Sequence, residues 1–343
     1  MVREPLPLWK QRLQFWPLRA GVALLRLAGP RISLWGAALA GSIFYRLSGR
    51  HRRRALRHLR LAFPDWEPAR LDAAAKRSFQ NFLQLAIEMV FMPLCIHRGN
   101  YEQHIERHDP IGCLPLLRER KAKLLVTGHL GNWEATGYFL SLEGHPLAAV
   151  ARPLDNRLLN DWLVSLRTRR GMKVIEKWDR ADAKIVQSLE NQEAVGFIAD
   201  QNGGDRGVFV PFFGRLASTS KSVALLAINL RVPILCGCGV RVSRWGLRYR
   251  ISSTDLIRPE DWESQEDPIY YITARFVRAI EQMVREQPDR YLWMHRRWKS
   301  RPQWEVKGQP MPASFERRLR ALPWMDEATL SGLKEPLGFD SYA

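Results

Sequence analysis

The run Lys123-Leu-Leu-Val-Thr127-Gly-His129-Leu-Gly-Asn132-Trp-Glu134 carries the strongest signal for the fold of this chain. Residues 123–127 form a short β-type run that ends at a glycine, and the acidic residue that follows suits the start of a helix. A strand that passes through a turn directly into a helix is typical of α/β proteins. The run therefore predicts an α/β fold, with a turn at the carboxyl end of this strand.

The same alternation continues along the chain. Short β-type runs alternate with stretches of helical periodicity, and that order predicts a mainly parallel sheet covered by helices. The expected strands cover residues 123–127, 147–151, 173–176, 194–199, 234–242 and 248–252. The expected helices cover residues 66–95, 155–170, 181–190, 220–230 and 269–286. We assign residues 61–300 to this α/β domain and residues 301–343, rich in proline and charge, to a loosely attached C-terminal extension.

Residues 1–60 are expected to form an N-terminal region that combines an apolar segment with a basic flank. The apolar residues 13–47 are interrupted by arginines and by Pro30, and the uncharged stretch 32–45 is shorter than the ~20 residues that cross a bilayer. A cluster of arginines from Arg46 to Arg60 follows at once. This order is typical of a membrane anchor whose basic flank stays in the cytoplasm against anionic lipid. The alternative is a buried helix followed by a solvated basic face.

The amino-acid composition indicates which kind of partner the protein binds. The chain of 343 residues has 53 Lys and Arg against 35 Asp and Glu, a net charge of +18, which indicates an anionic partner or surface. Its 13 tryptophans favour a membrane interface, although nucleic-acid binding also uses aromatic side chains for base stacking. The four cysteines match no usual zinc spacing and no dense disulfide framework, so we expect no metal site and a reducing compartment.

His129 and Glu134 are the first candidates for chemistry. Ligands of open α/β sheets collect at the carboxyl ends of strands, where a histidine can act as a general base and a carboxylate can fix its tautomer. Residues five apart on one helix lie about 140° apart around its axis. His129 is therefore expected in the turn and Glu134 in the first turn of the next helix, whose free N–H groups suit an oxyanion. The alternative is a turn histidine without a role and a glutamate favoured by the helix dipole.

Three further residues are candidates for the same site. Asp200 ends the expected strand 194–199, on the same rim as His129 if the two strands are parallel; its alternative role is a turn or helix cap. Arg152 follows strand 147–151, and its cation could stabilise an oxyanion or bind a phosphate, unless it is an ordinary surface arginine. Asn132 is grouped with these two as a substrate-binding or oxyanion residue.

The run from His129 to Glu134 resembles the H-x4-[DE] box of the lipid A biosynthesis acyltransferases, the lauroyl and myristoyl transferases of lipopolysaccharide assembly. Four more segments resemble that family in the same order, at residues 151–156, 200–202, 210–214 and 291–299. The resemblance extends over residues 10–300, including the N-terminal apolar and basic segment. Each motif is weak singly, whereas the ordered set is specific.

The resemblance implies a glycerol-phosphate-acyltransferase-like fold and direct acyl transfer without a covalent acyl-enzyme. His129, oriented by Glu134, would take the proton of an acceptor hydroxyl, which would then attack the thioester of acyl carrier protein or CoA. The acceptor implied is an anionic glycolipid, a lipid A precursor, at the cytoplasmic face of a bacterial inner membrane. No cofactor, metal or nucleic acid is expected. The absence of a G-x-S-x-G elbow gives a serine nucleophile no support.

Three alternatives remain open at this stage. The first is an acyltransferase for another lipid, such as a lysophospholipid, a different glycolipid or an aminoacyl lipid. The second is a basic nucleic-acid-binding protein, whose binding would weaken steeply with salt. The third is a membrane scaffold without catalytic activity.

Overall fold

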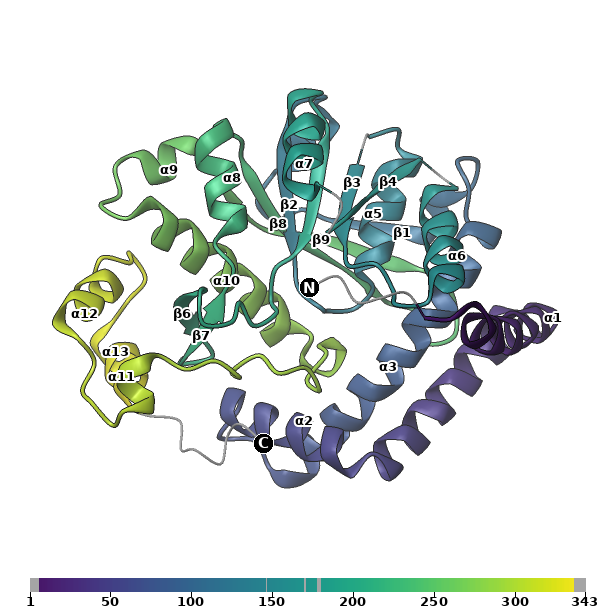
Figure 1. Ribbon diagram of the computed structural model, residues 1–343, viewed down its shortest axis with the longest axis horizontal. Helices are drawn as coiled ribbons and strands as arrows, with labels where there is room; N and C mark the ends of the chain where they lie inside the picture. Colours follow the sequence, from purple (N-terminus) through teal and green to yellow (C-terminus); the bar gives the residue numbers. More distant parts are fainter. Residues whose placement is uncertain (1–5, 146, 170, 178–179, 336–343) are drawn as a thin grey trace.

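The computed structural model describes residues 6–145, 147–169, 171–177 and 180–335 (Figure 1). Its central sheet has seven strands in the order β1-β9-β8-β2-β5-β3-β4. Strands β8, β2, β5, β3 and β4 run parallel, whereas β9 pairs antiparallel with β8 and parallel with β1. The predicted α/β fold with a mainly parallel sheet is therefore confirmed. The strands are β1 (Ile105–His108), β2 (Lys123–Thr127), β3 (Leu147–Ala151), β4 (Met172–Glu176), β5 (Ala194–Ile198), β8 (Ile234–Arg241) and β9 (Tyr249–Ile257).

Helices cover both faces of the sheet. Buried side chains of α7, α8 and α10 belong to one apolar cluster, and those of α5 belong to two others. The helices of the α/β body are α5 (Trp133–Leu142), α6 (Arg157–Thr168), α7 (Ala181–Glu190), α8 (Ser222–Leu230) and α10 (Pro268–Glu286). Shorter helical turns are η1 (Tyr101–His104), α4 (Leu114–Arg118), α9 (Pro259–Glu263) and η2 (Pro288–Arg290).

The apolar N-terminal segment forms one long helix with a sharp bend. Helix α1 (Leu8–Leu47) is interrupted at Gly29, whose φ of 76° is outside the helical region, directly before Pro30. Its second half packs along α3 (Pro68–Cys95), and a Cβ added to Gly41 would lie 2.6 Å from the Cα of Gln80. By length and composition α1 could cross a membrane, and 22% of its most apolar window is buried inside the protein. The bend divides this helix into two shorter apolar pieces.

The basic cluster lies mainly on helix α2 (Gly49–Ala62), which packs against the body through one side. His58 is buried and its Nδ1 lies 3.0 Å from the carbonyl oxygen of Trp293, while Arg54 donates to the carbonyl of Met294 at 3.1 Å. Arg50, Arg53 and Arg60 are exposed. One side of this basic helix is therefore docked on the body and the other is open to solvent, while contact of its arginines with lipid stays a prediction.

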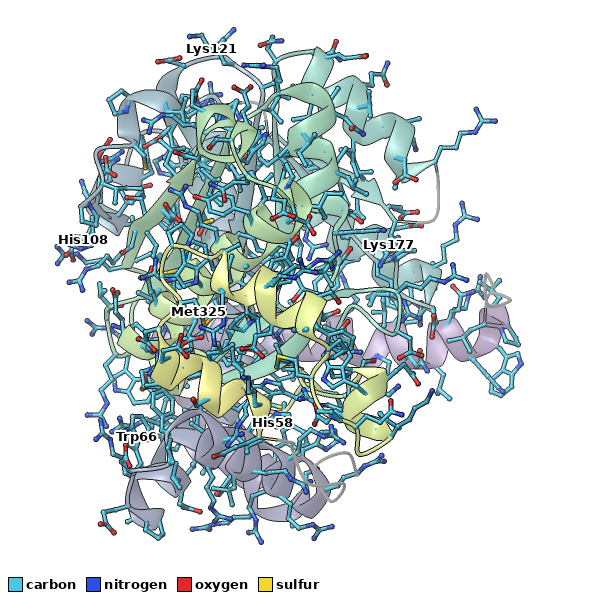
Figure 2. All side chains as sticks on the ribbon, turned by 90° about the vertical axis from the view of Figure 1, so that its left-hand side faces the viewer. His58, Trp66, His108, Lys121, Lys177 and Met325 are labelled. Carbon is cyan, nitrogen blue, oxygen red and sulfur yellow. The ribbon has the colours of Figure 1, made fainter. Side chains whose placement is uncertain are left out.

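The C-terminal part of the chain packs firmly against the body. A hairpin of β6 (Val208–Phe212) and β7 (Arg215–Thr219) is followed, after α10, by α11 (Gln303–Val306), α12 (Ala313–Arg320) and α13 (Glu327–Lys334). Leu319, Leu330 and Leu333 are buried in the same cluster as the sheet. Figure 2 shows these helices lying against the body, with Met325 among them. The expected loose attachment is wrong for residues 301–335, because their leucines fill a shared core.

A cavity-forming substitution should test this packing. Leu330 is 1% exposed, so Leu330→Ala should lower the free energy of unfolding by ~2–5 kcal/mol. Val306 on α11 is 44% exposed, and Val306→Ala should change the free energy of unfolding by no more than about 0.5 kcal/mol. Denaturant unfolding of both variants in the same detergent makes the comparison. Equal, small effects would show that these helices do not share the core.

Candidate functional site

The site is built by two neighbouring parallel strands that end in register. Thr127 of β2 pairs with Ile198 of β5, and the N–H of Ala199 donates to the carbonyl of Thr127 at 2.9 Å. Two residues beyond each strand end, His129 and Asp200 therefore face each other. The Nδ1 of His129 lies 2.6 Å from Oδ1 of Asp200, and the backbone N–H of His129 donates to Oδ2 at 2.8 Å. Both carboxylate oxygens thus hold the histidine.

Glu134 lies where the sequence predicts, in the first turn of α5, but its carboxylate has another partner. Arg167 of α6 donates through Nε to one oxygen of Glu134 at 2.9 Å and through a terminal nitrogen to the other at 2.5 Å. The start of α5 carries Glu134 toward α6, while parallel pairing brings Asp200 beside the imidazole. The orientation of His129 by Glu134 is therefore corrected: the carboxylate that contacts this ring is Asp200.

The protonation of the pair follows from burial and charge. Burial by itself would lower the pKa of His129, but the charge of Asp200 and its hydrogen bond outweigh burial and raise that pKa above the ordinary value. Burial would raise the pKa of Asp200, but the charge and hydrogen bonds of His129 hold that pKa well below its usual range. An ionised carboxylate only accepts, so Nδ1 of His129 carries a proton. Its Nε2, which lies 3.3 Å from Nε2 of Gln201, is the ring nitrogen that can accept a proton.

Asn132 holds the turn from within. It is the N-cap of α5, where its Oδ1 accepts from the N–H of Ala135 at 2.9 Å. Its Nδ2 donates to Glu88 at 2.7 Å, and Glu88 is paired in turn with Arg241 at 2.8 Å. Asn132 is 2% exposed and both ends of its amide are engaged by the protein. Asn132 therefore positions the turn that carries His129, and its amide is not available for the expected contact with substrate.

The backbone of the same turn is clamped against β8. The N–H of Asn132 donates to the carbonyl of Gly239 at 2.7 Å. Gly131 has a φ of 59°, and a Cβ added there would lie 2.4 Å from that carbonyl oxygen. Only glycine therefore fits this contact without displacing β8.

The segment 291–299 supports the site from beneath. Leu292 donates its N–H to the carbonyl of His129 at 2.9 Å, and the ring of His295 lies 6.0 Å from the ring of His129. Arg297 is 1% exposed and donates to the carbonyl of Ser218 at 2.7 Å. Tyr291, Trp293 and Trp298 are buried too. These side chains hold the fold together and are not available for base stacking, which removes one argument for a nucleic-acid partner.

A large cavity opens beside the histidine. Its volume is about 1270 Å³, above the ~300–1,000 Å³ common for small-molecule sites. Its polar lining includes His129, Glu134, Arg167 and Gln201, together with Arg107, Asp109, Glu143 and Asp182. Most of the remaining lining is apolar, and includes Leu125, Leu140, Leu147, Met172, Ile185, Val186, Ile198 and Leu226. This arrangement suits a ligand with a long apolar part and a reactive polar end.

Arg152 and Arg167 occupy different positions in that lining. The side chain of Arg152 is 63% exposed and lies 3.8 Å from Asp155, whereas the side chain of Arg167 is 17% exposed. Arg152 is therefore at the open part of the cavity, and Arg167 is inside it. Arg167 was not predicted as a site residue, because the sequence does not distinguish one arginine in an amphipathic helix from the many other arginines of this basic chain.

The predicted site residues are thus brought to one edge of the sheet. His129, Glu134 and Arg152 line the cavity, Asp200 contacts His129, and Asn132 fixes the turn from below. Among the residues that the structure describes, no group of three or more His, Cys, Asp or Glu side chains is arranged to hold a metal ion.

Comparison with known proteins adds independent information. A family model described as bacterial lipid A biosynthesis acyltransferase matches residues 7–300. A lipid A biosynthesis acyltransferase of Haemophilus influenzae is 27% identical over 88% of this chain and 97% of its own length. The lipid A biosynthesis lauroyltransferase of Escherichia coli is 25% identical over 84% of this chain and 94% of its own. The myristoyltransferase of the same organism is 22% identical, with coverage of 86% and 90%.

The electrostatics of the pair can be tested by titration. Because the pKa of His129 is raised, its protonated form contributes folding stability that is fully present below the unfolded-state pKa of ~6.5 and is lost as pH rises through the folded pKa. The lowered pKa of Asp200 contributes stability that is present above its unfolded-state pKa of ~3.9 and is lost as pH falls further. Asp200→Asn should bring the pKa of His129 below ~6.5, since burial then acts without the opposing charge. NMR of histidine-labelled protein measures this pKa.

Glu134→Gln is the matched control for that titration. It removes a carboxylate charge from the same cavity but leaves the Asp200 contact, so the pKa of His129 should stay above its ordinary value. If the pKa of His129 fell strongly in Glu134→Gln and did not fall in Asp200→Asn, Glu134 and not Asp200 would be the residue that raises this pKa.

Proposed function

Since the chain belongs to the bacterial lipid A biosynthesis acyltransferase family and is an acyltransferase, we propose that it moves a fatty-acyl group from a carrier thioester to a hydroxyl of a lipid A precursor. The observation that carries this proposal is the His129–Asp200 pair, whose histidine lines a large and mostly apolar cavity. Such a cavity accommodates an acyl chain while the thioester carbonyl stays near the base.

The proposed reaction is direct transfer. Nε2 of His129 takes the proton of the acceptor hydroxyl as its oxygen attacks the thioester carbonyl carbon. The C–S bond then breaks, and the leaving thiolate receives the proton from the imidazolium. Asp200 holds the ring with Nδ1 protonated and stabilises the imidazolium between these two transfers. Gln201, which contacts Nε2 in the structure, would give way to the acceptor hydroxyl.

In this proposal Arg167 supplies a positive charge beside the thioester carbonyl, and Glu134 holds Arg167 in place. The two-point contact with Glu134 fixes the guanidinium of Arg167 in the cavity lining. A fixed cation, together with the free N–H groups at the start of α5, can stabilise the oxyanion of a tetrahedral intermediate. Glu134 then remains part of the site, as the residue that positions Arg167.

Arg152 is proposed to bind a phosphate. It lies at the open part of the cavity and stays largely exposed, which suits a headgroup or carrier phosphate better than a buried oxyanion. The donor is acyl carrier protein or CoA, both of which present an anionic group to this basic chain. We expect the reaction to need no cofactor.

Membrane association is proposed to occur through the N-terminal region. Helix α1 exposes large apolar side chains along its length, and α2 exposes arginines beside it. Apolar residues flanked by arginines favour the cytoplasmic face of the bacterial inner membrane. The order of strand, histidine turn and helix also supports the expected glycerol-phosphate-acyltransferase-like arrangement of the body.

Replacing the base should nearly abolish acyl transfer. His129→Ala and Asp200→Asn should each lower kcat by about 10²-fold or more, because the two residues act as one unit. His97→Ala, on an exposed turn away from the cavity, should leave kcat unchanged. Acyl transfer to a lipid A precursor, followed by mass spectrometry, gives the rates. More than about a tenth of wild-type activity in His129→Ala would be incompatible with general-base catalysis by this residue.

Arg152 should affect binding more than turnover. If it holds a phosphate in the ground state, Arg152→Gln raises the KM for the phosphorylated substrate and leaves kcat largely intact. Arg157→Gln is a suitable control, since that side chain is 82% exposed and does not line the cavity. A fall in kcat at constant KM would instead assign Arg152 to the transition state.

A further inference from the structure

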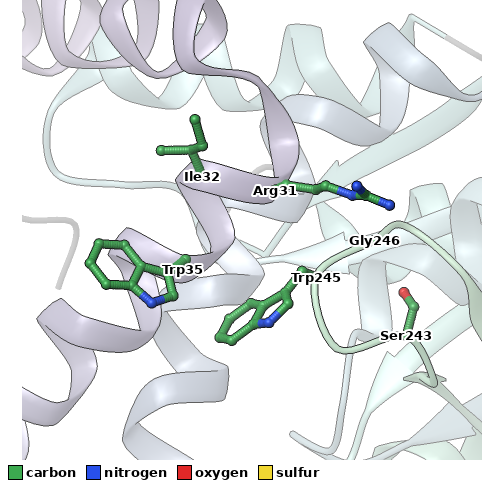
Figure 3. Close-up of a pocket in the computed structure, with 6 residues that line it drawn as sticks. All are labelled: Arg31, Ile32, Trp35, Ser243, Trp245 and Gly246. Carbon is green, nitrogen blue, oxygen red and sulfur yellow. The ribbon is translucent and has the colours of Figure 1, made fainter.

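A groove outside the candidate site separates α1 from the turn that joins β8 and β9. Its volume is about 500 Å³, and it is lined by Arg31, Ile32, Trp35, Ser243, Trp245 and Gly246. Figure 3 shows Trp35 of α1 and Trp245 of the β8–β9 turn on two sides of this space, with Arg31 along its edge. We call it the Trp35–Trp245 groove.

One side of α1 leads into this groove as an apolar stripe. Ile32 is 63% exposed, Trp35 57%, Leu39 49% and Ile43 48%, at spacings that place all four on one face of the helix. The opposite face of the same segment is buried against α3. This stripe therefore points away from the body, and the protein itself does not cover it.

The charged side chains of the two stretches that build the groove all have one sign. The sequence contains no Asp or Glu in residues 5–64 or 232–254, the two stretches that build it. Arg31 lines the groove, and the guanidinium of Arg244 lies over the Trp245 ring at 5.2 Å from its centroid. Tryptophan next to arginine suits the boundary between acyl chains and phosphate headgroups.

We propose that the Trp35–Trp245 groove is a second membrane-contact site, which seats the β8–β9 turn and the α1 stripe on anionic phospholipid. Phosphate headgroups lie against Arg31 and Arg244, and the indoles lie at the upper ends of the acyl chains. A second copy of this chain does not fit as well, because a symmetric contact would bring arginines together without any acidic partner. The proposal rests on the proposed association of α1 with the membrane.

Binding of the Trp35–Trp245 groove to lipid would fix the orientation of the His129 edge of the sheet relative to the bilayer. The β8 strand that carries the turn accepts the N–H of Asn132 at Gly239, beside the His129 turn. Arg241 of β8 donates to the carbonyls of Ser243 and Arg244, both at 2.5 Å, and is paired with Glu88 at 2.8 Å. The turn is therefore fixed rigidly to the strand that supports the site. Seating it places that edge next to the surface from which a lipid acceptor arrives.

Vesicle binding tests the proposal without an activity assay. Purified full-length protein is titrated with phosphatidylcholine vesicles that contain or lack phosphatidylglycerol, and the bound fraction is measured by flotation. Arg244→Glu should weaken binding to the anionic vesicles by about fivefold or more, since one basic residue near such a surface contributes roughly that factor. Trp35→Glu replaces an indole by a negative charge beside the anionic headgroups and should weaken binding by about the same factor. Val306→Glu, a matched exposed position, should change binding less than about twofold, since α11 lies at the opposite end of the molecule from α1 (Figure 1).

A conservative pair of variants locates the contact itself. Trp245→Phe keeps an apolar ring in the groove, so the fold is retained, but it removes one indole. If brominated phospholipid quenches Trp245, this variant should lose part of the quenched emission. Trp304→Phe, on α11, should lose none of the emission that the brominated lipid quenches.

Each negative outcome has a distinct meaning. If wild-type protein binds no vesicles, the proposed association of α1 fails and this proposal fails with it. If wild-type protein binds while both Glu variants keep full affinity and Trp245 is not quenched, only the Trp35–Trp245 groove is excluded. A change in oligomeric state with Trp35→Glu at unchanged vesicle affinity would identify the groove as a contact between copies and overturn the proposal. None of these results depends on His129.

Discussion

The backbone hydrogen bonds between β2 and β5 are the constraint on which the candidate site depends. They set Thr127 opposite Ile198, and this register brings the residues two positions beyond each strand to the same point. His129 and Asp200 meet there although 71 residues separate them in the sequence. The α5 cap, the Gly239 contact and the segment 291–299 all act on the same turn from other directions. A one-residue shift of either strand would reverse the side chains and separate the pair.

The positive charge of the chain serves two separate purposes. Arg241 and Arg297 are buried and donate to carbonyl or carboxylate oxygens, so they fasten β8 and the β6–β7 hairpin to the rest of the protein. Arg50, Arg53 and Arg60 are exposed on α2, and Arg244 lies at the Trp35–Trp245 groove. The net charge of +18 therefore overstates the basic surface that a partner meets. The aromatic residues divide in the same way between the core and the face of α1.

The predicted strands and helices of the α/β body agree closely with the structure because their signals are local. Strand β2 and helix α7 have the predicted ends, and β5 and α8 differ by one or two residues, whereas β9 continues five residues beyond its predicted end and the β6–β7 hairpin was not predicted. Strand β1 reads Ile-Glu-Arg-His, which has no apolar run, and it exists because β9 offers it a parallel edge. The C-terminal helices are short and charged, so their burial depends on leucines that only the assembled core can receive. Local periodicity cannot report such contacts.

The sequence by itself determined the α/β class, the histidine turn after β2 and the position of Glu134 at the start of a helix. It also placed Asp200 at the end of a strand on the same rim. It assigned Glu134 as the partner of His129, and this assignment is wrong, because spacing along the chain gives no strand order. Only the tertiary structure decided the partner, by placing β5 next to β2 and α6 next to α5. The partner of His129 is set by which strands are neighbours, and the packing of the whole sheet decides which strands are neighbours.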